Sequence, residues 1–204
     1  MSFGGPDSAM AKSKGTRQKI KDAALECFLT YGFRGTTIAL IARKTKTSKP
    51  LVLYHYKNTE VLLFELMNEW AQSGKSTTDL YLQKLLGHPP RDIIVALQDA
   101  TFDWMVKYPK MASFSTVLFQ AAIEVKEVQK FLFQVFEGGR LRIDTLLKQI
   151  PRIKNLPEFE RKGLATSIHC LIFGSSLYIV GQGQKGIMKH TKEFNVRAIL
   201  HALA

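Results

Sequence analysis

The sequence predicts an all-α protein, with a small N-terminal unit of three helices followed by a larger helical bundle. Apolar residues recur at three- and four-residue steps along most of the chain. The sequence contains neither sustained alternation of apolar and polar residues nor Asn-Gly pairs, the patterns that are typical of strands and hairpins. With 204 residues, 46% of them hydrophobic, the chain can bury a full core without disulfides.

The first two predicted helices have clear ends. The first begins at Thr16, a suitable N-cap, and ends at Gly32, which can take the left-handed backbone conformation that stops a helix. A short second helix follows, with Thr36 or Thr37 as its cap, and ends near Thr45.

A tight connection then leads into a third short helix, KPLVLYHY. Ser48 is its expected N-cap, and Pro50 falls within the first turn, where the missing N–H costs nothing. Eight residues that each rise about 1.5 Å span about 12 Å, enough to lie across a DNA major groove. Val52 and Tyr56 are expected to face the small core. Two short helices joined in this way have the spacing of a helix-turn-helix motif.

The rest of the chain is predicted to be helical as well. Asn58 is the expected cap of a longer helix that passes through Trp70. Glycine and proline clusters divide the remainder into helices near 91–107, 110–122, 124–149, 158–180 and 192–203. Gly138 and Gly139 should bend the 124–149 helix, and a complete break is also possible there. The glycine-rich stretch 181–186 is expected to be a flexible loop.

Positive charge is concentrated near the N-terminus. The chain has 29 Lys+Arg and 17 Asp+Glu residues, a formal net charge of +12. Between residues 10 and 60, eleven basic residues stand against Asp22, Glu26 and Glu60, a net +8. Such a region indicates a polyanionic partner, either nucleic acid or an acidic membrane surface. Whether its first lysines contact phosphate or form a solvated face is left open.

Several classes of protein are disfavoured. The sequence has no G-x-S-x-G, H-E-x-x-H, Cys-x-x-Cys or Walker motif, so we expect neither an enzyme nor a cofactor. His169 is interpreted as a core or interface histidine, because Cys170 points about 100° away on a helix and no second pair of metal ligands is near. Cys27 and Cys170 lie in apolar helical patterns, which disfavours a disulfide. No apolar run approaches the roughly 18 residues of a membrane span. We therefore expect a cytoplasmic protein without a membrane partner.

The stretch from Ile20 to Leu62 reads I-x2-AA-x3-F-x3-GF-x2-TT-I-x2-IA-x5-SKP-x3-YHYKN-x-E-x-L. In order and spacing it resembles the TetR/AcrR family of bacterial transcriptional regulators. The resemblance implies a homodimer that binds a palindromic double-stranded DNA operator and is released from it by a small molecule. The implied domains are a flexible leader at 1–14, a helix-turn-helix DNA-binding domain at 15–60, and a helical ligand-binding and dimerisation domain at 61–204.

The resemblance also places the DNA contacts. Thr37 falls at a phosphate-contacting position, and the recognition-helix positions meet bases and backbone. The expected DNA-binding residues are Thr37, Ser48, Lys49, Pro50, Leu51, Tyr54, His55 and Lys57. Tyr54 and His55 have an alternative role as half-buried packing residues. Lys46 stands where the family usually has a glycine, so a left-handed backbone there would carry a side chain at some cost.

The larger unit is predicted to bind a mostly hydrophobic effector and to dimerise. Its many aromatic and methionine side chains are individually typical of a core but together suggest an apolar cavity between helices. The expected ligand-binding residues are Trp70, Trp104, Tyr108, Phe119, Gln120 and Phe173, with Glu124 and His169 as further polar candidates. The segment 164–180 and the last helix are expected to pair with their symmetry mates. The predicted interface residues are Ile168, Leu171, Ser175, Tyr178 and Phe194.

Overall fold

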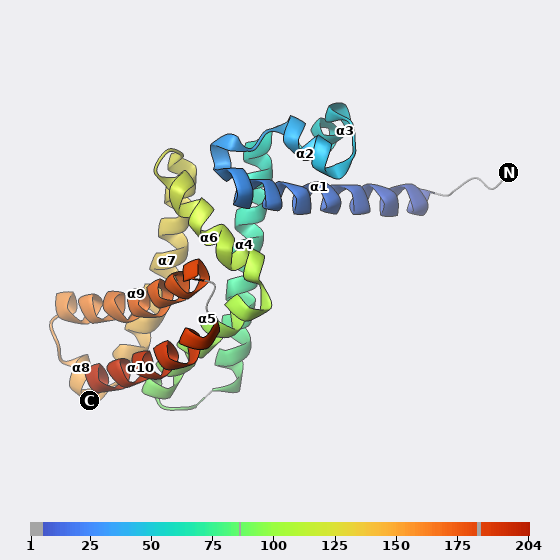
Figure 1. The fold of residues 1–204 in the computed structure, drawn as a ribbon. Helices are drawn as coiled ribbons and strands as arrows, with labels where there is room; N and C mark the ends of the chain where they lie inside the picture. The colour runs from blue at the N-terminus through green and yellow to red at the C-terminus, as the bar shows by residue number, and fades with distance from the viewer. Residues whose placement is uncertain (1–5, 86, 183–184) are drawn as a thin grey trace. The chain divides into compact units, whose positions relative to one another are not determined.

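The computed structural model describes residues 6–85, 87–182 and 185–204, with side chains described for 15–85, 87–178 and 189–204. Within these ranges the chain is all-helical, as the sequence predicts, and ten helices follow one another without a strand (Figure 1). The chain divides into two compact units, Met1–Glu69 and Trp70–Ala204. No helix in the described ranges has the length and apolar character needed to cross a membrane.

The first unit contains three helices and the beginning of a fourth. They are α1 (Pro6–Gly35), α2 (Ile38–Thr45), α3 (Lys49–His55) and α4 (Thr59–Lys84), whose later part belongs to the second unit. The side chains that fill its core come from all four helices and are less than 2% exposed: Ile20, Ala24, Phe28, Ile41, Val52, Tyr56, Leu62, Leu63 and Leu66. The predicted inward positions of Val52 and Tyr56 are therefore confirmed.

Helix α1 differs from the prediction at its start. It begins at Pro6 rather than Thr16, so residues 6–14 are helical where a flexible leader was expected. The residues upstream of Thr16 include Ala9, Met10 and Ala11, which have high helix propensity, and a proline suits the first turn of a helix. A possible cap inside such a sequence does not force the helix to begin there.

The predicted turn residues act as the sequence indicates. Gly32 has a positive φ of 68°, although the helical hydrogen bonding resumes beyond it and α1 ends at Gly35. Thr37 accepts a hydrogen bond from the backbone N–H of Leu40 at 3.2 Å and so caps α2. Ser48 accepts from Leu51 N–H at 3.3 Å and caps α3.

The second unit is a helical bundle built on the rest of α4. It contains α5 (Pro90–Lys107), α6 (Pro109–Ala122), α7 (Lys126–Leu147), the short α8 (Pro151–Lys154), α9 (Glu158–Gln182) and α10 (Lys185–Leu203). Helices α5, α7, α9 and α10 share one apolar core, which includes Ile94, Ile143, Leu147, Ile168 and Ile199. Figure 1 shows α9 and α10 side by side.

Three details of this unit depart from the sequence prediction. Helix α7 runs unbroken through Gly138 and Gly139. The break predicted at 150–157 contains α8, one turn that starts with Pro151. The predicted loop at 181–186 is partly helical, because α9 continues to Gln182 and α10 begins at Lys185, while residues 183–184 lie outside the described residues.

Candidate DNA interface and ligand cavity

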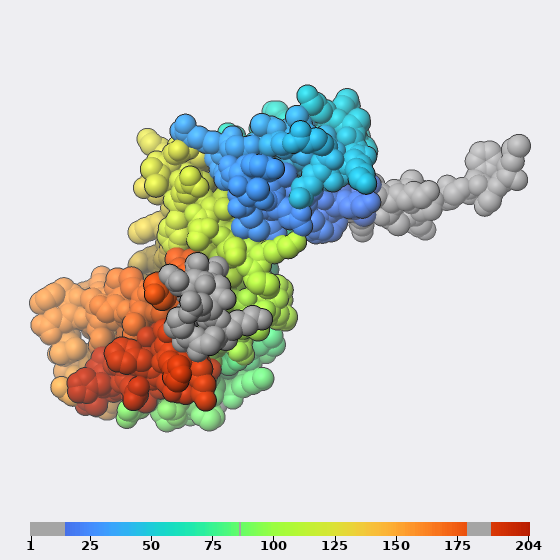
Figure 2. All heavy atoms as spheres, in the orientation of Figure 1, coloured from blue at the N-terminus to red at the C-terminus, as the bar shows by residue number. Residues whose placement is uncertain are grey.

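Helix α3 presents a row of side chains at the surface of the first unit (Figure 2). Tyr54 is 81% exposed, Leu53 47% and Leu51 38%, while Val52 on the opposite face is fully buried. Of the predicted DNA-binding residues, only His55 is half-buried. The others, Thr37, Ser48, Lys49, Pro50, Leu51, Tyr54 and Lys57, are exposed. The aromatic rings of Tyr54 and His55 meet edge to face at 5.2 Å between centroids. The alternative of half-buried packing therefore fits His55 but not Tyr54.

The turn between α2 and α3 carries the predicted irregular backbone. Lys46 has φ 56° and ψ 42°, which is the left-handed helical region, and it is the only non-glycine residue with positive φ in the described chain. Its N–H donates to the Arg43 carbonyl at 3.2 Å, and the next N–H, of Thr47, donates to Ala42 at 2.9 Å. These bonds satisfy carbonyls at the end of α2 and fix where α3 begins.

A charged cluster holds the end of α3 against α1 and α4. The hydroxyl of Tyr56 donates to Glu65 at 3.1 Å, and Arg17 pairs with the same carboxylate at 2.6 Å while lying 4.9 Å from the Tyr56 ring centre. The ammonium of Lys21, itself buried, reaches Glu65 at 3.5 Å and also pairs with Glu69. No local pattern in the sequence indicates this cluster, because its members are separated by up to 52 positions along the chain.

The ionisation of the cluster follows from this geometry. Burial and the neighbouring Glu65 carboxylate raise the pKa of Tyr56 to about 12, so its hydroxyl stays protonated and able to donate. Burial alone would raise the pKa of Glu65, but the hydrogen bond and charge of Arg17 outweigh it and the pKa is lowered. Glu65 therefore remains a carboxylate that accepts from three directions.

The second unit contains a partly open cavity of about 340 Å³ between α4, α5, α7 and α9. Its wall is aromatic: the rings of Trp70 and Trp104 meet at 6.4 Å, and those of Phe136 and Phe173 at 4.8 Å. Each indole N–H is satisfied within the unit, Trp70 by the Ser115 hydroxyl and Trp104 by that of Ser73, both at 2.9 Å. A ligand therefore meets apolar ring faces rather than unpaired indole donors.

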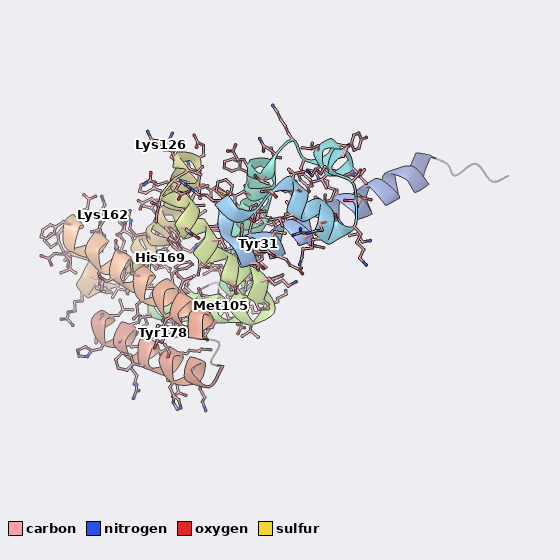
Figure 3. The ribbon with its side chains drawn as sticks, turned by 45° about the horizontal axis from the view of Figure 1, so that its top comes forward. Tyr31, Met105, Lys126, Lys162, His169 and Tyr178 are labelled. Carbon is pink, nitrogen blue, oxygen red and sulfur yellow. The ribbon has the colours of Figure 1, made fainter. Side chains whose placement is uncertain are left out.

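His169 lies on α9 at one side of this cavity (Figure 3). A Cβ added to Gly139 on α7 would lie 2.4 Å from its Nε2 atom, so the ring can approach α7 only because that residue is glycine. Burial, and then the positive charges of Arg142 and Arg140, lower the pKa of His169 below its ordinary value of 6.5. The imidazole is therefore neutral at neutral pH. Of the two glycines Gly138 and Gly139, only Gly139 is a place of close helix approach.

The predicted ligand-binding residues fall into three groups. Trp70, Trp104 and Phe173 line the cavity. Phe119 lines a neighbouring groove of about 410 Å³ that shares Phe136 and Phe173 with it. Tyr108 and Gln120 line neither, because Tyr108 lies between α5 and α6 with its ring beside Lys107, and Gln120 is exposed on α6. Sequence reasoning missed the polar lining residues Lys75, Gln134 and Arg142.

The predicted dimer residues are also divided. Ile168 is only 3% exposed and belongs to the core of its own unit, so its assignment to a subunit interface was wrong. Leu171 and Ser175 are half-buried, and Ser175 accepts a hydrogen bond from Asn195 of α10 at 2.8 Å. Tyr178 (Figure 3) and Phe194 are 59% and 63% exposed.

These features define a class of protein: a helix-turn-helix DNA-binding protein with a second helical unit that holds an aromatic cavity. The family described as "Bacterial regulatory proteins, tetR family" matches residues 20–66, the region of α1 to α4 that forms the DNA-binding unit. Over this region the chain is assigned to the TetR family of transcriptional regulators, which makes it a DNA-binding regulator. The family assignment and the all-helical fold class predicted from the sequence are confirmed.

Proteins similar to this chain include a curated transcriptional regulator and two solved structures. The HTH-type transcriptional regulator BetI of Serratia proteamaculans is 28% identical over 158 residues, which cover 78% of this chain and 77% of BetI. A TetR-like transcriptional regulator from Rhodococcus sp. RHA1 has the same fold, with a TM-score of 0.75 and 16% identity over 91% of this chain and 94% of that one. FadR from Bacillus subtilis, solved in complex with stearoyl-CoA, has a TM-score of 0.68 and 14% identity over 89% and 96% of the two chains.

Proposed function

We propose that the chain is a ligand-responsive repressor. As a homodimer it binds a palindromic DNA operator through α3 of each subunit, and a hydrophobic small molecule in the cavity of the second unit releases it. The observation that carries the DNA-binding part is the exposed row on α3, a short helix fixed on its other face by Val52 and Tyr56. A regulator of chromosomal DNA acts in the cytoplasm, and we place this chain there.

The residues around α3 divide into two kinds of contact. Thr37, Ser48, Lys49 and Lys57 offer hydroxyl and ammonium groups that suit phosphate oxygens. Leu51 and Tyr54 offer apolar surface, which favours contact with thymine methyl groups over hydrogen-bonded reading of guanine. His55, half-buried against Tyr54, positions that ring. Because each neutralised phosphate adds about 0.9 to the slope of log affinity against log salt, six to ten contacts per dimer make binding steeply salt-dependent.

The cavity supports the effector part of the proposal. Its volume of about 340 Å³ lies within the usual range of roughly 300–1,000 Å³ for small-molecule sites. Trp70, Trp104, Phe136 and Phe173 give it the apolar aromatic lining that such sites commonly have. FadR, which shares the fold, was solved with stearoyl-CoA, a ligand with a long apolar chain.

The exposed faces of α9 and α10 support the homodimer. Cys170, Gly174 and Tyr178 follow one another at four-residue steps on α9, and all are exposed. The small residue at 174 permits close approach of a second helix, and Tyr178 and Phe194 supply apolar area. We place the interface on this face, with Leu171 and Ser175 at its inner edge.

Selection of bound fragments from a random DNA pool tests the proposal. We expect a palindromic sequence to be enriched by the full-length protein. Tyr54→Ala should bind that sequence at least about tenfold more weakly, because the most exposed ring on α3 is removed. Tyr31→Ala is the matched control, since Tyr31 is also exposed on the first unit but lies on α1 outside the helix-turn-helix (Figure 3). Failure to enrich any palindrome, or equal binding by the two variants, would contradict the proposal.

A further inference from the structure

The titratable side chains that line the cavity are all basic in type, and two of them, Lys75 and Arg142, are charged at neutral pH. Lys75 from α4, Arg142 from α7 and His169 from α9 are among the lining residues, and no Asp or Glu of the described chain is. The rest of the lining is apolar or uncharged. A cavity that combines aromatic walls with positive charge of this kind favours a ligand that carries the opposite charge.

Several carboxylates on the helices around the cavity pair with residues other than Lys75 and Arg142. On α5, Asp103 accepts a hydrogen bond from a tyrosine of α4. On α7, Glu137 holds Arg140 through two hydrogen bonds of 2.8 and 2.5 Å, and Asp144 accepts from Arg161 of α9 at 2.9 Å. No described carboxylate forms an ion pair with Arg142 or Lys75. The guanidinium at the cavity is therefore available to a ligand.

Arg142 and His169 also mark the polar end of the cavity. Both line a small recess of about 90 Å³ that adjoins the main cavity and shares Thr78, Thr101 and Phe173 with it. The two threonine hydroxyls donate to carbonyls of their own helices, at 3.0 and 2.9 Å. The groups left to donate to a ligand at this end are the guanidinium and the imidazole N–H.

The lowered pKa of His169 reflects both its burial and the positive charge around it. After burial, the largest causes of its lowered pKa are the positive charges of Arg142 and Arg140. Glu137, which pairs with Arg140, does not line the cavity, and Lys75 adds a further positive charge at the α4 side. The same positive charges that disfavour the protonated form of His169 would repel a cationic ligand at this place and attract an anionic one.

We propose that the cavity selects an anionic amphiphile, a molecule with an aromatic or alkyl body and one carboxylate, whose carboxylate is bound by Arg142 while its apolar body lies among Trp70, Trp104, Phe136 and Phe173. Arginine suits this role because its planar guanidinium donates two parallel hydrogen bonds to a carboxylate. The inference rests on the proposed function of the cavity and adds the charge class of the effector to it.

Calorimetric titration of the full-length protein with three matched probes tests the charge class. Naphthoate, naphthylmethanol and naphthylmethylammonium share one ring system, comparable in size with the indoles that line the cavity, and differ in charge. We expect naphthoate to bind at least about tenfold more tightly than the alcohol, and the ammonium to bind most weakly, because a charge-assisted hydrogen bond is stronger than a neutral one.

Variants then assign the preference to a residue. Arg142→Gln should weaken naphthoate binding about tenfold and change the affinity for the alcohol by less than about twofold. Arg91→Gln, which removes an exposed arginine at the start of α5 outside the cavity, is the control and should change neither. As a second readout, bound naphthoate should raise the pKa of His169 in an NMR titration, and the alcohol should not.

The outcomes separate this inference from the function on which it rests. Tighter binding of the alcohol or the ammonium, at a site that still perturbs His169, would overturn the charge preference and leave the cavity as an effector site. Loss of alcohol and naphthoate binding together in Arg142→Gln would overturn the role of that residue in charge recognition. The wild-type comparison does not depend on any variant folding. Absence of binding by all three probes would overturn both the charge preference and the proposed effector cavity.

Discussion

Replacing Lys46 by glycine should stabilise the protein, because the backbone there is held in a conformation that suits glycine. Lys46 has φ 56° and ψ 42°. A residue with a Cβ in the left-handed region destabilises the folded state by roughly 1–2 kcal/mol, and glycine would remove this strain. Glycine also makes the unfolded chain more flexible, which reduces the stabilisation by roughly 0.5–1 kcal/mol. We therefore expect Lys46→Gly to raise the free energy of unfolding by about 0.5–1 kcal/mol.

Urea unfolding followed by far-UV circular dichroism measures this change. Lys46→Ala is the matched control, since it removes the same charge but keeps a Cβ at the same φ, and it should leave stability within about 0.5 kcal/mol of the wild type. The N–H of residue 46 still donates to Arg43 in both variants, so the end of α2 is capped in each. Equal stability of the glycine and alanine variants would refute the reasoning that the turn is strained by its side chain.

Three further predictions concern close packing, pH and the charged cluster. Gly139→Ala should lower stability by about 1–3 kcal/mol in thermal unfolding, because the new methyl group would overlap His169. Gly138→Ala on the same helix is the control: its methyl group meets no atom within 4 Å, so it should raise stability by up to about 1 kcal/mol. The free energy of unfolding should fall as the pH drops below 6.5, because the pKa of His169 is lower in the folded state than in the unfolded state. His169→Gln should flatten this pH dependence, and a variant with the same pH profile as the wild type would contradict the prediction. Glu65→Gln should lower stability by about 1–2 kcal/mol in urea unfolding, because the buried Lys21 and its neighbours lose a charged partner, and a neutral result would show that the cluster does not hold α3 in place.

Local chemistry explains which parts of the fold the sequence predicted well. Thr37, Ser48 and Asn58 each cap the helix that follows, with bonds of 3.2, 3.3 and 2.9 Å to a backbone N–H three residues on. The left-handed backbone at Lys46 was expected from the family pattern, which usually has a glycine at this position. These features depend on a few consecutive residues, so they can be predicted from the local sequence.

Tertiary packing determines which apolar side chains line the cavity and which belong to the core, and the sequence alone does not show this. Trp70 and Phe173 line the cavity but Tyr108 does not, and all three lie in similar apolar helical patterns. Ile168 is in the core rather than at the surface because α9 turns that face toward α5 and α7. Arg142 resembles any surface arginine in the sequence, and only the fold brings it to a cavity without acidic groups. Periodicity identifies a buried face but not the neighbour it meets.

Ligand-responsive repression requires that binding in the cavity changes the affinity of the DNA interface. Fluorescence anisotropy of the selected palindrome should be measured with the wild-type protein as naphthoate, the probe expected to bind the cavity, is raised to saturation. We expect operator affinity to fall by at least about tenfold, and Arg142→Gln to need about tenfold more naphthoate for the same release. An operator affinity that stays constant while calorimetry shows the cavity filled would contradict this expectation.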